Sequence, residues 1–270
     1  MPSVSRDGAA IYFETSMPIG VLDASPPWVT LINGHTRTST DFRPMTRYLN
    51  DKGFAVLTFD NRGCGKTVVG GPVSGASMVE DVAALWDECG ITTSAVLGIS
   101  MGGMIAQHLI AQYQSRVWAG ILVSTTSDKR HVISSRTPWV PEVTHIKGKL
   151  ERFFSPAFVQ RNGHLIEAMA KNTLKAMEGG RFQQGVDQQV GAMESFTDPR
   201  IETIRIPILI LHGELDIVVV PAAVEDFRRR IANAEIHMYP DVGHLLLAEA
   251  PKILYRDVGE FLLAKRSVLA

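Results

Sequence analysis

The sequence predicts an α/β fold, with a mostly parallel eight-stranded sheet flanked by helices and a helical cap insertion. Short, wholly apolar runs alternate along the chain with longer amphipathic stretches of helical period. These runs lack a polar face, as do parallel strands that helices cover on both sides. The alternation breaks between about residues 128 and 200, where helical stretches follow one another without a buried strand. We expect an insertion there.

Seven segments predict strands, because they are short, apolar and rich in β-branched residues. In chain order they are Ala9–Phe13, Trp28–Ile32, Phe54–Phe59, Ser94–Ile99, Gly120–Ser124, Ile208–His212 and Glu235–Tyr239. The pattern does not locate the eighth strand.

Eight segments with apolar residues at helical spacing predict helices. Five of them lie among the strands: Phe42–Leu49, Ala76–Cys89, Met104–Tyr113, Pro221–Ile231 and Pro251–Ala264. Three lie in the break: His145–Phe154, Ala157–Met177 and Arg181–Phe196. We therefore expect residues 1–127 and 201–270 to form the core, and residues 128–200 to form the cap.

Composition narrows the class of partner. The 270 residues carry 27 basic and 28 acidic side chains, and this balance does not favour nucleic acid or an anionic membrane surface as a binding partner. Cys64 and Cys89 are too few for a disulfide framework or a zinc cluster, and no apolar leader or membrane span is apparent. We expect a cytoplasmic protein with a small uncharged substrate and neither metal nor cofactor. Homo-oligomerisation stays open.

The segment Gly98-Ile99-Ser100-Met101-Gly102 fits the pattern G-x-S-x-G and lies between a buried strand and an apolar helix. A serine between glycines is often only a turn residue. Here the flanking strand and helix favour a sharp turn that lifts a nucleophilic hydroxyl out of the sheet. Ser100 is the predicted nucleophile.

A serine hydroxyl needs a neutral imidazole to take its proton and a carboxylate to orient that imidazole. Asp216 follows the strand ILILHG, and His244 follows a glycine in the loop after the last strand. Asp216 could instead cap a helix, but the order serine, aspartate, histidine is the one this architecture requires. We predict Asp216 as the acid and His244 as the base, with activity falling below about pH 6.5, the ordinary histidine value.

Acyl transfer also needs two N–H donors aimed at the oxygen that becomes negative. The backbone N–H of Met101 is one predicted donor, because Met101 directly follows the serine. The second is expected from the loop Asn33-Gly34-His35 after the strand WVTLI, where His35 takes the donor's place.

Four motifs in order resemble those of the α/β-hydrolase superfamily. They are Asp60–Thr67 (D-x-R-G-x-G-x-S turn), Gly98–Gly103 (nucleophile turn), His212–Asp216 (acid loop) and Gly243-His244 (histidine loop). The resemblance is nearest to the esterases, enol-lactonases and cofactor-free haloperoxidases, although Asn33 stands where these relatives usually carry histidine. Serine at position 100 differs from the aspartate of haloalkane dehalogenases and epoxide hydrolases. Gly65-Lys66-Thr67 is not a phosphate loop, since Asp60 occupies the position of its first glycine.

These residues predict a hydrolase that cleaves a carboxylic ester or lactone through an acyl-enzyme. Eight apolar cap residues are candidates for the acyl pocket: Trp139, Phe153, Phe154, Met169, Met177, Phe182, Met193 and Phe196. Carbon–carbon bond hydrolysis or perhydrolysis on the same triad stays open, as does a slow-turnover ligand receptor. A peptidase would need a charged anchor in the cap, for which Glu151, Glu167 and Glu178 are candidates.

Overall fold

The computed structural model describes residues 1–19, 25–133 and 138–266, and it confirms the predicted α/β fold. Eight strands form one sheet in the order β1-β2-β4-β3-β5-β6-β7-β8, in which β3 to β8 run parallel and the β1–β2 and β2–β4 pairs are antiparallel. The strands are β1 (Ser3–Arg6), β2 (Ala9–Ser16), β3 (Trp28–Ile32), β4 (Ala55–Phe59), β5 (Ser94–Ile99), β6 (Val117–Val123), β7 (Ile208–Gly213) and β8 (Ala234–Tyr239).

Strand β1 is the one that apolar patterning did not locate. It is four residues long, alternates between exposed and partly buried residues, and pairs only with β2 at the edge of the sheet. A short edge strand needs no apolar run, because one side of its ladder faces solvent. By contrast every residue of β4, β5, β6 and β7 is buried.

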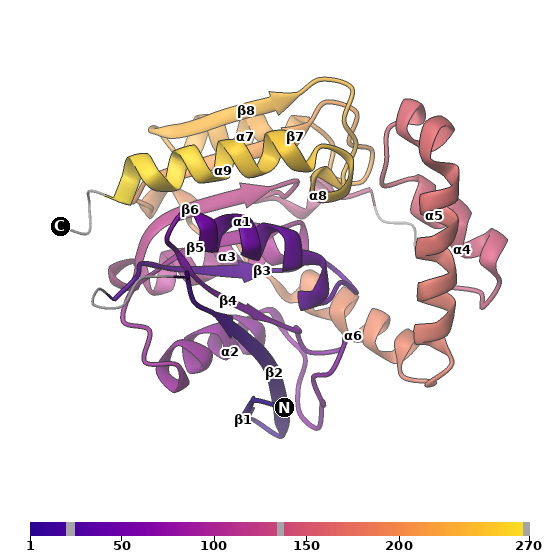
Figure 1. Ribbon diagram of the computed structural model, residues 1–270, viewed down its shortest axis with the longest axis horizontal. Coiled ribbons are helices and arrows are strands. Elements are labelled where there is room, and N and C mark those ends of the chain that lie inside the picture. The colour runs from indigo at the N-terminus through magenta and orange to yellow at the C-terminus, as the bar shows by residue number, and fades with distance from the viewer. Residues whose placement is uncertain (20–24, 134–137, 267–270) are drawn as a thin grey trace.

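Helices cover both faces of the sheet (Figure 1). Those outside the β6–β7 connection are α1 (Arg43–Asp51), α2 (Gly75–Glu88), α3 (Met101–Gln112), α7 (Ala222–Arg230), α8 (Leu246–Glu249) and α9 (Pro251–Lys265). Apolar residues of α2, α3 and α7 pack in one cluster against the sheet, and those of α1 and α9 pack in another on the opposite face. Helix α3 begins at Met101, three residues before its predicted start, because the chain turns into the helix directly after Ser100.

The connection from β6 to β7 carries three helices, α4 (Val143–Glu151), α5 (Pro156–Met177) and α6 (Phe182–Ser195). They lie beyond the sheet, on the side to which the arrowheads of β3 and β8 point (Figure 1). Helices α4 and α5 have a small apolar cluster of their own, which includes Ile146, Phe154 and Ile166. This segment therefore stands over the carboxyl ends of the strands.

The strand order positions a crevice under these helices. From β3 the chain crosses to β4 on one side, whereas β5, on the other side of β3, leads on to β6 and β7. The loops after β3 and β5 therefore diverge to opposite faces, and in open α/β sheets this switch point is where ligands bind. The loop after β3 begins at Asn33, and the turn after β5 is Ser100.

None of the helices in the described part of the chain combines the length and the apolarity that crossing a membrane would need.

Candidate active site

Ser100 occupies a strained turn between β5 and α3. Its φ of 55° and ψ of −118° lie in a region that residues other than glycine rarely adopt. The turn is held from both sides: the Ser100 N–H donates to the carbonyl of Val123 at 2.9 Å, and the Thr125 hydroxyl donates to the carbonyl of Ser100 at 2.7 Å. The hydroxyl is therefore presented at the carboxyl edge of the sheet by a rigid backbone.

Glycines make this turn possible by letting backbones approach closely. A Cβ at Gly98 would lie 2.3 Å from the carbonyl oxygen of Gly102, and a Cβ at Gly102 would lie 2.2 Å from that of Ile32. Backbone atoms cannot move away as the end of a side chain can, so no other residue fits at either position.

Gly98→Ala is therefore expected to lower the free energy of unfolding by about 3 kcal/mol, through overpacking against backbone. Urea denaturation measures the change. Gly191→Ala is the matched control, because it lies in helix α6 and a Cβ there meets no atom within 4 Å. Alanine at 191 should leave stability unchanged or raise it by up to about 1 kcal/mol. Equal stability of Gly98→Ala and wild type would refute the packing argument.

The structure brings His244 and Asp216 into one line with Ser100. The Oγ of Ser100 lies 3.0 Å from Nε2 of His244, and Nδ1 of His244 lies 2.7 Å from Oδ2 of Asp216. Both partners of the serine are almost fully buried. Because an ionised carboxylate only accepts hydrogen bonds, Nδ1 carries the proton, which leaves the lone pair of Nε2 facing the serine hydroxyl.

The second oxygen of Asp216 is fixed by the backbone. Its Oδ1 accepts the N–H groups of Val218 and Val219 at 2.8 and 2.9 Å. The carboxylate therefore cannot rotate freely, and Oδ2 stays directed at His244.

A second histidine, His212, lies on the other side of the same carboxylate. Its Nε2 donates to the carbonyl of Val219 at 2.9 Å and lies 3.5 Å from Oδ2 of Asp216. Burial lowers the pKa of His212, so it stays neutral and adds no charge that competes with His244. Sequence reasoning gave His212 no role. Its spacing of four residues from Asp216 was the available signal, but only the folded loop brings the two groups together.

Both segments that carry the predicted backbone donors lie beside Ser100. Met101 is the first residue of α3, so its N–H has no acceptor within the helix. The loop after β3 passes directly by the serine, since a Cβ at Gly34 would be 3.3 Å from Cβ of Ser100. His35 lines the cavity beside Ser100, and its side chain reaches helix α6, where Nε2 lies 3.3 Å from the carbonyl of Val186. Burial lowers the pKa of His35, which keeps its imidazole neutral.

A cavity of about 540 Å³ opens at Ser100, between the sheet edge and α4 and α6. Of the eight apolar residues proposed for its wall, Trp139, Phe153 and Met193 line it. The five others, Phe154, Met169, Met177, Phe182 and Phe196, are not among its lining residues. Phe154 stacks on Phe158 within the α4–α5 cluster, which shows why apolarity alone could not separate pocket residues from packing residues.

The cavity wall is not wholly apolar. Lys149, Arg152, Asp187 and Glu194 also line it. None of the three glutamates considered as a peptidase anchor, Glu151, Glu167 and Glu178, is a lining residue. Glu167 instead pairs with Lys171 on the surface of α5.

Known proteins resemble this chain over most of its length. A non-heme bromoperoxidase named as putative, BpoC of Mycobacterium tuberculosis, is 26% identical over 213 residues, which cover 74% of this chain and 79% of that protein. The 3-oxoadipate enol-lactonase 2 of Acinetobacter baylyi is 24% identical over 215 residues, covering 76% and 77% of the two chains.

Solved structures share the fold. The α/β-hydrolase enzyme MGS-M2, from a deep-sea metagenome library of the Medee basin, superposes with a TM-score of 0.84 at 18% identity, covering 97% of both chains. The enol-lactonase of Burkholderia xenovorans LB400 superposes with a TM-score of 0.80 at 23% identity, covering 97% of this chain and all of that one. Residues 25–251 match the family model described as serine aminopeptidase, S33. With this match over most of its length, and with the sheet order and strained serine turn described above, the chain belongs to that family within the α/β-hydrolase superfamily.

Proposed function

We propose that this protein hydrolyses a carboxylic ester or lactone through an acyl-enzyme formed on Ser100. One observation carries the proposal: the serine hydroxyl, the imidazole of His244 and the carboxylate of Asp216 lie in a continuous line with spacings of 3.0 and 2.7 Å. These are hydrogen-bond distances, so a proton can pass from the hydroxyl to the imidazole as the oxygen attacks.

In the proposed reaction, Oγ of Ser100 bonds to the carbonyl carbon while Nε2 of His244 takes the hydroxyl proton. The carbonyl oxygen becomes negative and is held by the N–H groups of Met101 and His35. His244 then gives its proton to the departing alkoxide, which leaves as the alcohol. In a lactone this alcohol stays attached to the acyl group. Water, deprotonated by His244, releases the acid and restores the serine.

The carboxylate of Asp216 supports both transfers. It accepts from Nδ1 and so keeps the lone pair of the imidazole on Nε2, and its charge stabilises the imidazolium that forms in each half-reaction. The apolar wall formed by Met104, Trp139, Phe153 and Val190 limits water around the acyl group. It favours substrates with an apolar acyl part.

A panel of p-nitrophenyl acyl esters and γ- to ε-lactones tests the proposal. We expect turnover of at least one of these classes, with a rate that declines on acidification because His244 acts only as the neutral imidazole. A rate that stays constant down to pH 5 would contradict the role of His244. No turnover of any ester or lactone would contradict the substrate class.

An aminopeptidase is a second candidate, favoured by the family description and by the carboxylate of Asp187 in the cavity wall, which could contact a substrate ammonium group. Aminoacyl p-nitroanilides separate it from the esterase. A higher kcat/KM for the anilides than for matched esters of the same acyl group would favour the peptidase.

A further inference from the structure

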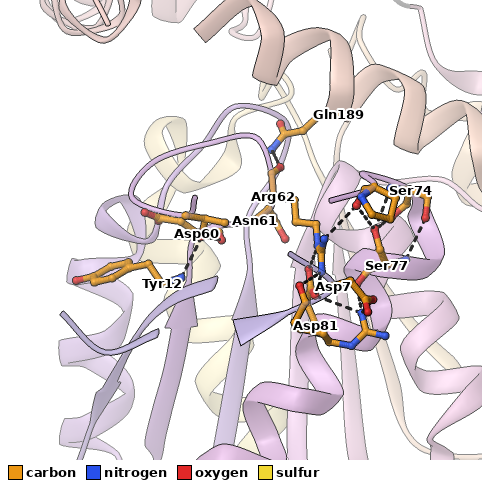
Figure 2. A network of polar contacts seen from close by, with 12 residues as sticks. Asp7, Tyr12, Asp60, Asn61, Arg62, Ser74, Ser77, Asp81 and Gln189 are labelled. Atoms are coloured by element: carbon orange, nitrogen blue, oxygen red, sulfur yellow. Dashed lines mark hydrogen bonds and ion pairs between the residues drawn. The ribbon is translucent and has the colours of Figure 1, made fainter. Parts of the chain in front are cut away.

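Gln189 is a fully buried polar residue on helix α6 that is not among the side chains lining the cavity. Its side-chain oxygen accepts the N–H of Thr36 at 2.7 Å, and its side-chain nitrogen donates to the carbonyl of Arg62 at 2.8 Å. Figure 2 shows the amide above the Arg62 backbone, reaching down from the helix. One side chain thus joins α6 to the loop after β3 and to the turn after β4.

Thr36 directly follows His35, and its φ of 62° is in the left-handed region. β-Branched residues rarely adopt this conformation, so surrounding contacts must hold it. Gly34, on the other side of His35, is pressed against Ser100. The backbone of His35 is therefore held on both sides, by the contact of Gly34 with Ser100 and by the hydrogen bond from Thr36 to Gln189.

The Arg62 carbonyl is a rigid partner for this amide. The buried guanidinium of Arg62 donates to both oxygens of Asp81, at 2.6 and 2.7 Å, as Figure 2 also shows. The next residue back, Asn61, donates from its side chain to the carbonyl of Asn33 at 2.9 Å. The turn after β4 is thus anchored to α2 on one side and to the start of the loop after β3 on the other. Gln189 anchors the same turn to helix α6.

Helix α6 approaches this turn backbone to backbone. A Cβ at Gly185 would lie 1.9 Å from the carbonyl oxygen of Gly63, so only glycine permits the contact. One turn of helix further on stands Gln189, and between them the carbonyl of Val186 meets the imidazole of His35. The register of α6 against the turn is therefore defined closely enough for a single amide to set the position of Thr36.

We propose that Gln189 is a positioning residue for the oxyanion hole, which holds the loop after β3 so that the His35 N–H points at the oxygen that becomes negative. The inference rests on the proposed function, in which that N–H is a donor. Helix α6 then contributes to the rate of the chemical step as well as to the wall of the cavity.

Gln189→Leu removes both hydrogen bonds at nearly constant volume. On the best p-nitrophenyl ester we expect kcat to fall 10- to 100-fold with KM changed less than about twofold, because a misaligned donor weakens binding of the transition state alone. The inhibition constant of a matching trifluoromethyl ketone, whose adduct places an oxyanion in the same hole, should rise by the same factor. Gln188→Ala, at the adjacent half-buried position, is the control and should leave both values within twofold.

Gln189→Glu provides a readout that loss of packing would not produce, and it serves if the leucine variant does not fold. As a neutral acid, glutamate can accept from Thr36 and donate to the Arg62 carbonyl as glutamine does. Once ionised it cannot donate, and its charge faces a carbonyl oxygen. This variant should therefore lose kcat as the pH rises, opposite to the acid-side loss expected from His244.

Superimposable pH profiles of Gln189→Glu and wild type would overturn the proposal. So would a folded leucine variant that keeps kcat and the ketone affinity within twofold, or one that loses affinity for substrate with kcat intact. Failure of the proposed function looks different: the wild type would then turn over no ester or lactone, or its activity would survive replacement of Ser100, whatever Gln189 does.

Discussion

Replacing Ser100 by alanine should lower kcat by roughly three orders of magnitude or more, while the protein remains folded. The reason is that every covalent step of the proposed reaction passes through Oγ of Ser100, and a neighbouring hydroxyl cannot replace it because the imidazole faces this oxygen at 3.0 Å. The alanine variant also lacks the acceptor of a fluorophosphonate probe, so labelling should disappear together with turnover.

Thermal unfolding checks that the Ser100→Ala fold is intact. Relief of the strained φ of 55° does not follow from this change, since alanine has the same Cβ. Ser127→Ala is the matched control, because the buried hydroxyl of Ser127 finds no hydrogen-bond partner among the described residues. It should keep both labelling and activity. Persistent turnover or labelling in Ser100→Ala would remove Ser100 from the role of nucleophile.

Asp216→Asn should lower kcat by about 10⁴-fold with the fold retained. Two backbone N–H groups, from Val218 and Val219, hold the outer oxygen of residue 216. In the asparagine variant they should keep the amide oxygen in that position, which turns the NH₂ group toward Nδ1 of His244. The amide then donates to Nδ1, the imidazole proton moves to Nε2, and no lone pair faces the serine hydroxyl.

Steady-state kinetics with the best ester measures this loss, and KM should change little because Asp216 does not line the cavity. Asp226→Asn is the control: it alters another His–Asp contact, 2.9 Å to Nε2 of His131, outside the line to Ser100. That variant should stay within a few-fold of wild type. An Asp216→Asn enzyme with more than about a tenth of wild-type activity would contradict orientation by the carboxylate.

The fold could be predicted because its signals are local. Strands β3 to β7 are buried on both faces and therefore read as short apolar runs, and the helices carry one apolar stripe. Strand β1 has neither feature, since it lies at an edge, and the prediction of eight strands left it without a position. The nucleophile turn could be located for a similar reason, because close backbone contact imposes glycine at positions 98 and 102.

Contacts between distant segments could not be predicted in the same way. Three of the eight proposed pocket residues line the cavity, whereas Phe154, Met169 and Met177 pack in the α4–α5 cluster. Apolar side chains of the two kinds look the same in sequence. Charged side chains reach the wall from α4, from Arg152 directly after it, and from α6, and charged faces of helices are usually solvated.

By itself the sequence determined the α/β class and the order of the elements, and it predicted the proposed triad Ser100, Asp216 and His244, because periodicity and close-packed glycines are visible over a few neighbouring positions. Only the tertiary structure decided which side chains enclose the cavity, that His212 lies against Asp216, and that Gln189 spans from α6 to Thr36, 153 positions away. Those contacts depend on how helices dock on the sheet, and docking is set by the summed packing of many residues rather than by any local pattern.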